Sequence, residues 1–185
     1  MTAQTKKRAL VTGGSGGIGA AICQRLAANG HHVLVHANRS RERAAEVVEN
    51  ICRDGGSAEV VVFDVADRQA CAAAIESLLE QGPVQILVNN AGIHDDAVFP
   101  GMTPAQWDSV IDVSLNGFFN VTQPLTLPML RTRWGRIISI SSVAAVAGNR
   151  GQVNYAAAKG ALHAASKSLA LELASRGVTV NVVAP

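Results

Sequence analysis

Short apolar runs and longer helical patterns follow one another along the chain in a regular order. Six runs of four to six residues have the apolar character of buried strands: Arg8–Val11, His32–His36, Glu59–Phe63, Gln85–Asn89, Arg136–Ser141 and Val178–Val183. Five other segments show the three- and four-residue apolar spacing of helices: Ile18–Asn29, Arg41–Asp54, Arg68–Gln81, Thr103–Arg131 and Tyr155–Arg176. This alternation predicts parallel βαβ units. We therefore expect an α/β fold of the doubly wound Rossmann type, a parallel sheet with helices on both faces.

Residues that start and stop helices sharpen these boundaries. Asp67 is the predicted N-cap of the third helix, and Thr103 followed by Pro104 starts the fourth. Pro124 and Pro128 should kink or break the last turns of the fourth helix, because proline lacks an N–H and clashes with the preceding turn. Glycines are the predicted C-terminal stops of the other four helices: Gly30, Gly55, Gly82 and Gly177.

Composition limits the possible classes of protein. The 185 residues are 48% apolar and 16% charged, which predicts one globular domain over residues 1–185 with a loose tail over residues 1–6. A formal net charge of +2 predicts no bulk affinity for nucleic acid. No apolar stretch reaches the roughly 20 residues of a membrane span, and no signal-peptide core precedes the first strand. The three cysteines are too scattered for a disulfide framework or a metal cluster, so we expect a cytoplasmic protein without a metal.

A glycine-rich stretch, Thr12–Gly19, lies between the first strand and the first helix. Its glycines at positions 13, 17 and 19 fit a loop that cradles phosphates, because glycine lets backbone amides approach a pyrophosphate at the positive end of a helix. A plain chain reversal between strand and helix would also use glycine. The loop alone is therefore weak evidence for a dinucleotide site.

A second group of residues carries the chemistry of proton transfer. Tyr155 and Lys159 are four residues apart, so on a helix they share one face. Ser142 closes the fifth strand, at the carboxyl edge where α/β sheets bind ligands. Each residue has a structural alternative, since a lone tyrosine can pack, a lysine can snorkel to solvent and a serine can close a turn. Their ordered spacing, together with the glycine-rich loop, indicates a redox enzyme.

From Lys7 to Pro185 the chain resembles the short-chain dehydrogenase/reductase family. Besides the loop and the Ser142, Tyr155 and Lys159 set, the resemblance rests on Asp64–Val65, Asn89–Gly92 and Asn116. It is most similar to the 3-oxoacyl-[acyl-carrier-protein] reductases, judged by three stretches: Ile86–Ile93, Gly151–Lys159 and Ala174–Pro185. The family fold adds a seventh strand and a substrate-covering segment, so the sheet is expected to be truncated after its sixth strand. The resemblance also implies a homotetramer built partly on the two long helices.

The resemblance implies four catalytic residues: Asn116, Ser142, Tyr155 and Lys159. A ketone accepts hydride readily only if its oxygen is stabilised and protonated. Tyr155 would be the acid. A free phenol has a pKa of about 10, and a nearby positive charge, which Lys159 would supply, lowers such a pKa. Lys159 would also hold the nicotinamide ribose, Ser142 would donate to the substrate oxygen, and Asn116 would hold a water that relays protons to Lys159.

The resemblance also implies a cofactor site, whose expected residues, besides Tyr155 and Lys159, are Gly13, Ser15, Gly17, Ile18, Gly19, Asn38, Arg39, Asp64, Val65, Asn90, Ala91 and Gly92. Asp64 would accept from the adenine amine, or else only end a strand or cap the next helix. The second strand ends without an acid, and Arg39 can offer a fork of donors to a 2′-phosphate, which predicts NADPH. The structural alternative is that Arg39 is a solvated loop residue. Relatives that prefer NADPH often carry a basic residue just before the second glycine of the motif. This chain has Gly16 at that position.

These residues predict an NADPH-dependent reductase of 3-oxoacyl thioesters, whose acyl group is carried on acyl carrier protein or CoA. One alternative is a relative that acts on another carbonyl or alcohol, such as acetoacetyl-CoA or a polyol. Another is a non-catalytic dinucleotide-binding protein. Arg133 and Arg176 match positions where the resembled reductases place arginine, and we expect them to form a docking patch for the acidic carrier protein. Arginine near a helix end also complements the helix dipole, which is a purely structural alternative.

Overall fold

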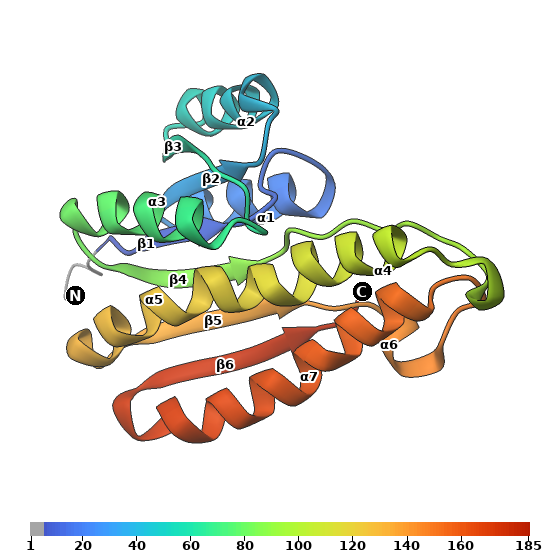
Figure 1. The fold of residues 1–185 in the computed structure, drawn as a ribbon. Coiled ribbons are helices and arrows are strands. Elements are labelled where there is room, and N and C mark those ends of the chain that lie inside the picture. Colours follow the sequence, from blue (N-terminus) through green and yellow to red (C-terminus); the bar gives the residue numbers. More distant parts are fainter. Residues whose placement is uncertain (1–5) are drawn as a thin grey trace.

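Six parallel strands form one sheet in the order β3-β2-β1-β4-β5-β6, in a computed structural model that describes residues 6–185 (Figure 1). The strands are β1 Arg8–Val11, β2 His32–Ala37, β3 Ser57–Val62, β4 Val84–Asn89, β5 Gly135–Ile140 and β6 Val178–Val183. The α-helices are α1 Gly17–Ala28, α2 Arg41–Arg53, α3 Arg68–Glu80, α4 Pro104–Ile111, α5 Gly117–Thr132, α6 Ala144–Ala147 and α7 Val153–Leu173. Two 3₁₀ turns, Phe99–Gly101 and Ala174–Arg176, and a π turn, Asp112–Asn116, complete the order. The predicted doubly wound α/β fold is confirmed.

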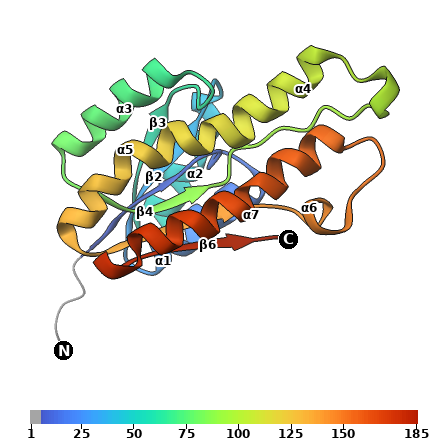
Figure 2. The ribbon, with the colours of Figure 1, turned by 60° about the horizontal axis from the view of Figure 1, so that its bottom comes forward.

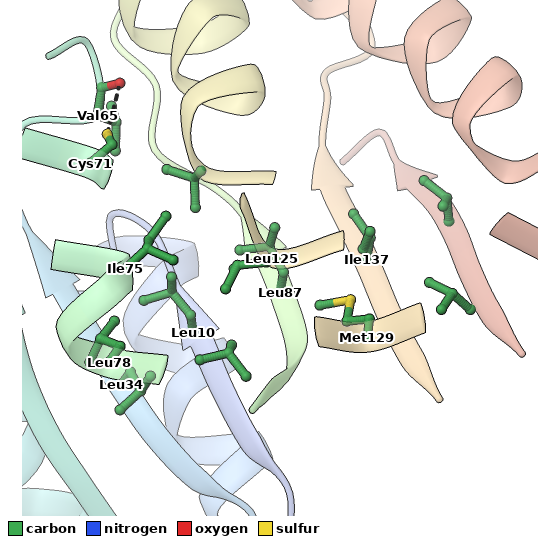
Figure 3. Packing of buried hydrophobic residues seen from close by; sticks show 14 of the residues in the cluster. Leu10, Leu34, Val65, Cys71, Ile75, Leu78, Leu87, Leu125, Met129 and Ile137 are labelled. Carbon is green, nitrogen blue, oxygen red and sulfur yellow. Dashed lines mark hydrogen bonds between the residues drawn. The ribbon is translucent and has the colours of Figure 1, made fainter. Parts of the chain in front are cut away.

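Helices cover both faces of the sheet. Helices α1 and α2 pack on one face, and α3, α5 and α7 on the other (Figure 1). The larger core lies under the second layer, where Leu10 and Leu87 of the central strands meet Ile75 of α3 and Leu125 of α5 (Figure 3). All four are at most 1% exposed. Burial of each such side chain contributes about 1.5–3 kcal/mol, which makes this layer a rigid base for the residues beyond the strand ends.

The predicted helix boundaries are largely confirmed. Asp67 caps α3 by accepting from Gln69 N and Ala70 N, and Thr103 caps α4 in a capping box with Gln106. The four predicted stops all have positive φ, which glycine adopts without strain: +85° at Gly30, +80° at Gly55, +117° at Gly82 and +73° at Gly177.

The predicted long helix Thr103–Arg131 is wrong in its interior. The structure divides it at the π turn Asp112–Asn116, and α5 then continues through Pro124 and Pro128 to Thr132. Three fully buried side chains hold α5 on the sheet, namely Val121, Leu125 and Met129. Their burial, about 1.5–3 kcal/mol for each side chain, offsets the roughly 3 kcal/mol that each of the two interior prolines costs, so tertiary packing overrides the local signal.

The carboxyl ends of the strands carry the segments that shape the candidate site. Helices α4 and α6 and the start of α7 extend beyond the arrowheads of β4 and β6 (Figure 2). The short helix α6 was not predicted. Within residues 6–185, no helix is both long enough and apolar enough to cross a membrane.

Candidate active site

The glycine-rich loop and the loop after β4 are joined where the chain order of the sheet reverses. The Thr12 hydroxyl accepts from Asn90 N and from Ala91 N, both at 3.0 Å. The Asn90 side chain donates to Thr12 O and Gly13 O, again at 3.0 Å. This switch point between β1 and β4 is where doubly wound sheets bind their ligands. The side-chain amide of Asn90 therefore holds the glycine-rich loop in place.

The glycine-rich loop fits the pyrophosphate of a dinucleotide. Gly13 and Gly17 have φ of +63° and +49°, and a Cβ on Gly19 would overlap the Gly13 carbonyl oxygen. The first turn of α1 has no side-chain cap. An uncapped helix N-terminus behind glycines offers backbone N–H groups and a positive dipole to an anion. Ser15 and Ile18 lie in and directly after this turn, as expected.

One cavity of about 210 Å³ joins this loop to the predicted catalytic residues. Ser142, Tyr155 and Lys159 line it, together with Ile18, Asn90 and Gly92. The structure therefore brings together three of the four side chains expected from the sequence. Two elements supply them: Ser142 follows β5, and the other two share a face of α7.

Lys159 is buried, contrary to the alternative that it snorkels to solvent. Lys159 is only 3% exposed, and its Nζ donates to Ile140 O at 2.9 Å. Nζ also lies 5.7 Å from the centroid of the Tyr155 ring. A Cβ on Gly92 would lie 3.0 Å from Nζ, so the glycine there makes room for the lysine. Burial lowers the pKa of Lys159 from 10.5 to about 8.

The hydroxyl of Ser142 and the start of α7 are held by local hydrogen bonds. Ser142 Oγ accepts from Ala144 N at 3.2 Å, which leaves its own proton for another acceptor. Asn154, fully buried, donates from Nδ2 to Asp95 O and Gln106 O, both at 2.9 Å. Asn154 thereby fixes the turn that carries Tyr155. Asn154 is not among the predicted site residues, although a polar residue directly before the tyrosine is a signal that the sequence carries.

The structure does not bring Asn116 to this cluster. Asn116 is exposed at the end of the π turn, where Nδ2 donates to Asp112 Oδ1 at 2.6 Å. Ser114, two residues earlier, is only 3% exposed and faces inward instead. A Cβ on Gly92 would lie 3.6 Å from Ser114 Oγ, so Ser114 and Lys159 flank the same glycine. Within residues 6–185, Ser114 Oγ has no hydrogen-bond partner.

The residues expected at the adenosine end surround the ends of β2 and β3. Asn38 and Arg39 are exposed directly after β2. Asp64, partly buried after β3, accepts from Ala66 N at 2.9 Å. Asp67 is the cap of α3, so Asp64 is not used for that purpose. Val65 is buried, and its carbonyl accepts from Asn120 Nδ2 at 3.0 Å.

The two arginines of the expected docking patch lie together at the opposite edge of the sheet. Arg133 precedes β5, Arg176 precedes β6, and both are exposed. Their loops touch, since a Cβ on Gly177 would lie 2.5 Å from Arg133 O. The strands are parallel, so the six residues of β5, about 20 Å, separate this edge from Ser142. The two strands therefore run toward the candidate site, but the arginines stand at their far ends.

Fold and site together define a nicotinamide-dinucleotide-dependent oxidoreductase. The chain belongs to the short-chain dehydrogenase family, whose model, described as short chain dehydrogenase, matches residues 7–185.

Curated relatives agree with this membership. The chain is 47% identical over 182 residues to nodulation protein G of Azospirillum brasilense, covering 98% of this chain and 74% of that protein. It is 47% identical over 180 residues to the 3-oxoacyl-[acyl-carrier-protein] reductase FabG of Staphylococcus aureus, with coverages of 97% and 73%. It is 44% identical over 182 residues to the acetoacetyl-CoA reductase of Cupriavidus necator, with coverages of 98% and 74%.

Proposed function

We propose that this protein reduces a 3-oxoacyl thioester to the 3-hydroxyacyl thioester with NADPH, the acyl group being carried on acyl carrier protein. The observation that carries the proposal is the cavity that Ser142, Tyr155 and Lys159 line together with Ile18, which lies in the glycine-rich stretch, and Asn90, which binds it. The names of two relatives, a 3-oxoacyl-[acyl-carrier-protein] reductase and an acetoacetyl-CoA reductase, support a 3-oxoacyl thioester as the substrate class. The intact Ser142, Tyr155 and Lys159 set argues against a protein that only binds a dinucleotide.

Ser142, Tyr155 and Lys159 each have a separate role in this reaction. Bound NADPH supplies the hydride to the ketone carbon. Ser142 donates its hydroxyl proton in a hydrogen bond to the ketone oxygen, and Tyr155 gives that oxygen a proton as negative charge develops on it. Lys159 holds a positive charge within 5.7 Å of the tyrosine ring and stabilises the phenolate that remains.

We assign the proton relay behind Lys159 to Ser114, in place of Asn116. A buried hydroxyl without a partner is costly, so its presence beside Lys159 fits a role in proton transfer. Ser114→Ala is expected to lower kcat about five- to tenfold, the value of one hydrogen bond, without loss of thermal stability. Asn116→Ala is expected to change kcat less than twofold. Steady-state kinetics of the two variants decide the matter, and the reverse order of effects would return the relay to Asn116.

Arg39 is proposed to set the preference for NADPH. Its exposed guanidinium can meet the 2′-phosphate with charge-assisted hydrogen bonds that a hydroxyl cannot match. Arg39→Asp is expected to reduce the NADPH-to-NADH ratio of kcat/KM by roughly 10- to 150-fold, or about 1.5–3 kcal/mol. Arg53→Asp, exposed at the other end of α2, is the control and should leave the ratio unchanged.

A substitution at Gly16 should raise the NADPH-to-NADH ratio of kcat/KM. This residue has extended backbone with φ of −169°, and a Cβ on it meets nothing within 4 Å. Gly16→Arg should therefore fit and strengthen the preference for NADPH. A wild-type protein that already prefers NADH would contradict the assignment of Arg39.

Docking of the carrier protein is proposed for Arg133 and Arg176. The Arg133→Glu, Arg176→Glu double variant is expected to raise the apparent KM for a carrier-bound 3-oxoacyl substrate about tenfold at low salt, and less at high salt, because exposed charges are screened. Its KM for acetoacetyl-CoA should not change. The matched control reverses two exposed arginines of the other helix layer, Arg25→Glu with Arg53→Glu. Equal losses on both substrates would indicate damaged folding, and no loss on either would exclude this patch.

The second candidate substrate is a CoA thioester, which the acetoacetyl-CoA reductase relative favours. NADPH oxidation by the wild-type protein, with carrier-bound and CoA-bound 3-oxoacyl substrates compared at equal concentration, separates the two. A preference for the CoA thioester of more than tenfold would replace the carrier protein in this proposal. Turnover of polyols alone would exclude both.

We also propose a homotetramer. The groove between α5 and α7 is lined by Phe118, Phe119 and Leu169, and Phe119 is 48% exposed. Pairing of two copies along these helices would cover this apolar surface.

A further inference from the structure

His36 contacts the glycine-rich loop from behind, on the side of the sheet. It lies near the carboxyl end of β2 and is 1% exposed. Its main-chain oxygen accepts from Gly14 N at 2.8 Å, and its Nδ1 accepts from Gly13 N at 3.0 Å. Its Nε2 lies 2.9 Å from Phe63 O, directly after β3. One residue thus joins the glycine turn to the end of β3, where Asp64 follows.

These partners allow only one form of the ring. Gly13 N–H can only donate, so Nδ1 must present its lone pair, and Phe63 O can only accept, so Nε2 must carry the proton. A second proton on Nδ1 would point at the Gly13 N–H and break that bond. Burial favours the same neutral form, since it lowers the pKa of His36 to about 4, although the bond to Phe63 and the charge of Asp64 oppose this.

Among the described residues, the charge that acts on the His36 ring is that of Asp64. Cys23 of α1, whose Sγ contacts Gly14 O at 3.8 Å, stays a neutral thiol because burial raises its pKa to about 12. Gly13 and Gly14 contribute only backbone groups to the contacts of His36. Within this part of the chain, Nδ1 pairs with Gly13 N–H and Nε2 with Phe63 O.

The bonds of His36 determine which amides of the loop remain for a ligand. The N–H groups of Gly13 and Gly14 are both taken by His36, and the Gly13 carbonyl is taken by Asn90. With its peptide groups fixed on both sides, the turn directs the later N–H groups, at the start of α1, toward the phosphate position. Loss of the Nδ1 acceptor would free Gly13 N–H and leave a partly buried donor unpaired.

We propose that His36 is a positioning residue for the dinucleotide: a neutral imidazole, protonated on Nε2, that holds the Gly13–Gly14 turn in its binding geometry without contacting the cofactor. This inference rests on the proposed dinucleotide site. It predicts that dinucleotide affinity depends mainly on a hydrogen-bond acceptor at the position of Nδ1. The volume of the ring and the bond to Phe63 should matter less.

Three substitutions separate these contributions. In His36→Asn the side-chain oxygen can take the place of Nδ1, in His36→Gln the longer amide can take the place of Nε2, and His36→Leu keeps neither. Kd for NADPH, measured by fluorescence titration, is expected to rise about tenfold or more in the Gln and Leu variants and less than threefold in the Asn variant. His31→Asn, in the turn before β2, is the control and should bind like the wild-type protein. Kd and the cofactor KM should change more than kcat.

A second measurement tests the ring directly. In ¹⁵N-labelled wild-type protein without cofactor, the nitrogen shifts of His36 should report the neutral form with the proton on Nε2 from pH 5 to pH 8. A proton on Nδ1, or equal Kd in the Asn, Gln and Leu variants, would overturn this inference. The nitrogen shifts need no folded variant, so they decide the matter even if a substitution prevents folding. A wild-type protein that binds no dinucleotide would instead overturn the proposed function, and this inference with it.

Discussion

Tyr155→Phe is expected to reduce kcat by about 10²- to 10⁴-fold while the Kd for NADPH stays within about threefold of the wild-type value. The substitution removes the proton donor but keeps the ring that lies 5.7 Å from Lys159 Nζ. Tyr155 is the only tyrosine of the chain, so no second phenol can replace it. Stopped-flow measurement of the first turnover, together with a fluorescence titration of NADPH, separates chemistry from binding.

The control for this experiment is the thermal stability of the variant. The Tyr155 ring is only partly buried, and the start of α7 is fixed by Asn154, so melting should change little. Activity close to that of the wild-type protein would show that Tyr155 is not the acid. A loss of activity accompanied by equal loss of NADPH binding would point to a collapsed site instead.

Lys159→Met is expected to abolish activity and at the same time to stabilise the folded protein at pH 7. The buried ammonium is costly: at 1.36 kcal/mol per pKa unit, the fall of its pKa from 10.5 to about 8 corresponds to roughly 3 kcal/mol. The loss of its hydrogen bond to Ile140 O, worth about 1 kcal/mol, offsets part of this gain. Urea unfolding should therefore show the variant more stable by about 1–3 kcal/mol at neutral pH.

The pH dependence of the free energy of unfolding tests the cost of the buried Lys159 charge independently. Below pH 8 the folded and unfolded states both bind the proton of Lys159, and between pH 8 and 10.5 the unfolded state binds more. The contribution of this group to wild-type stability should then rise with pH across that window, and the advantage of the variant should shrink. Activity should fall as pH rises through about 8, because the positive charge beside Tyr155 is lost.

Lys167→Met is the matched control, since Lys167 is exposed on the same helix. It should change neither activity nor stability by a measurable amount. If Lys159→Met were less stable than the wild-type protein at pH 7, the cost of the buried charge would be smaller than the value of its hydrogen bond to β5.

Most boundaries of the fold could be predicted because they depend on local chemistry. Strands β1 and β6 begin and end at the predicted residues, and the helix stops at Gly30, Gly55 and Gly82 are confirmed by positive φ. The exception is the segment Thr103–Arg131. Its prolines signalled a break that the packing of α5 on the sheet overrides, and its actual interruption, the π turn, has no sequence signal that we recognised.

The class of protein and the central residues of the candidate site could be predicted from local sequence patterns. A glycine-rich turn between strand and helix, and a tyrosine and lysine four residues apart, depend only on backbone geometry within one segment, so local spacing was enough to predict them. The contacts between distant segments were decided by the tertiary structure.

Three arrangements of distant residues illustrate the difference. The π turn directs Ser114, and not Asn116, toward Gly92 and Lys159. His36 meets Gly13 only because β2 lies beside β1 in the sheet. Arg133 and Arg176 stand at the far edge from Ser142 because all six strands are parallel. Each depends on which elements pack together and in what register, and a side-chain pattern along one segment carries no record of that.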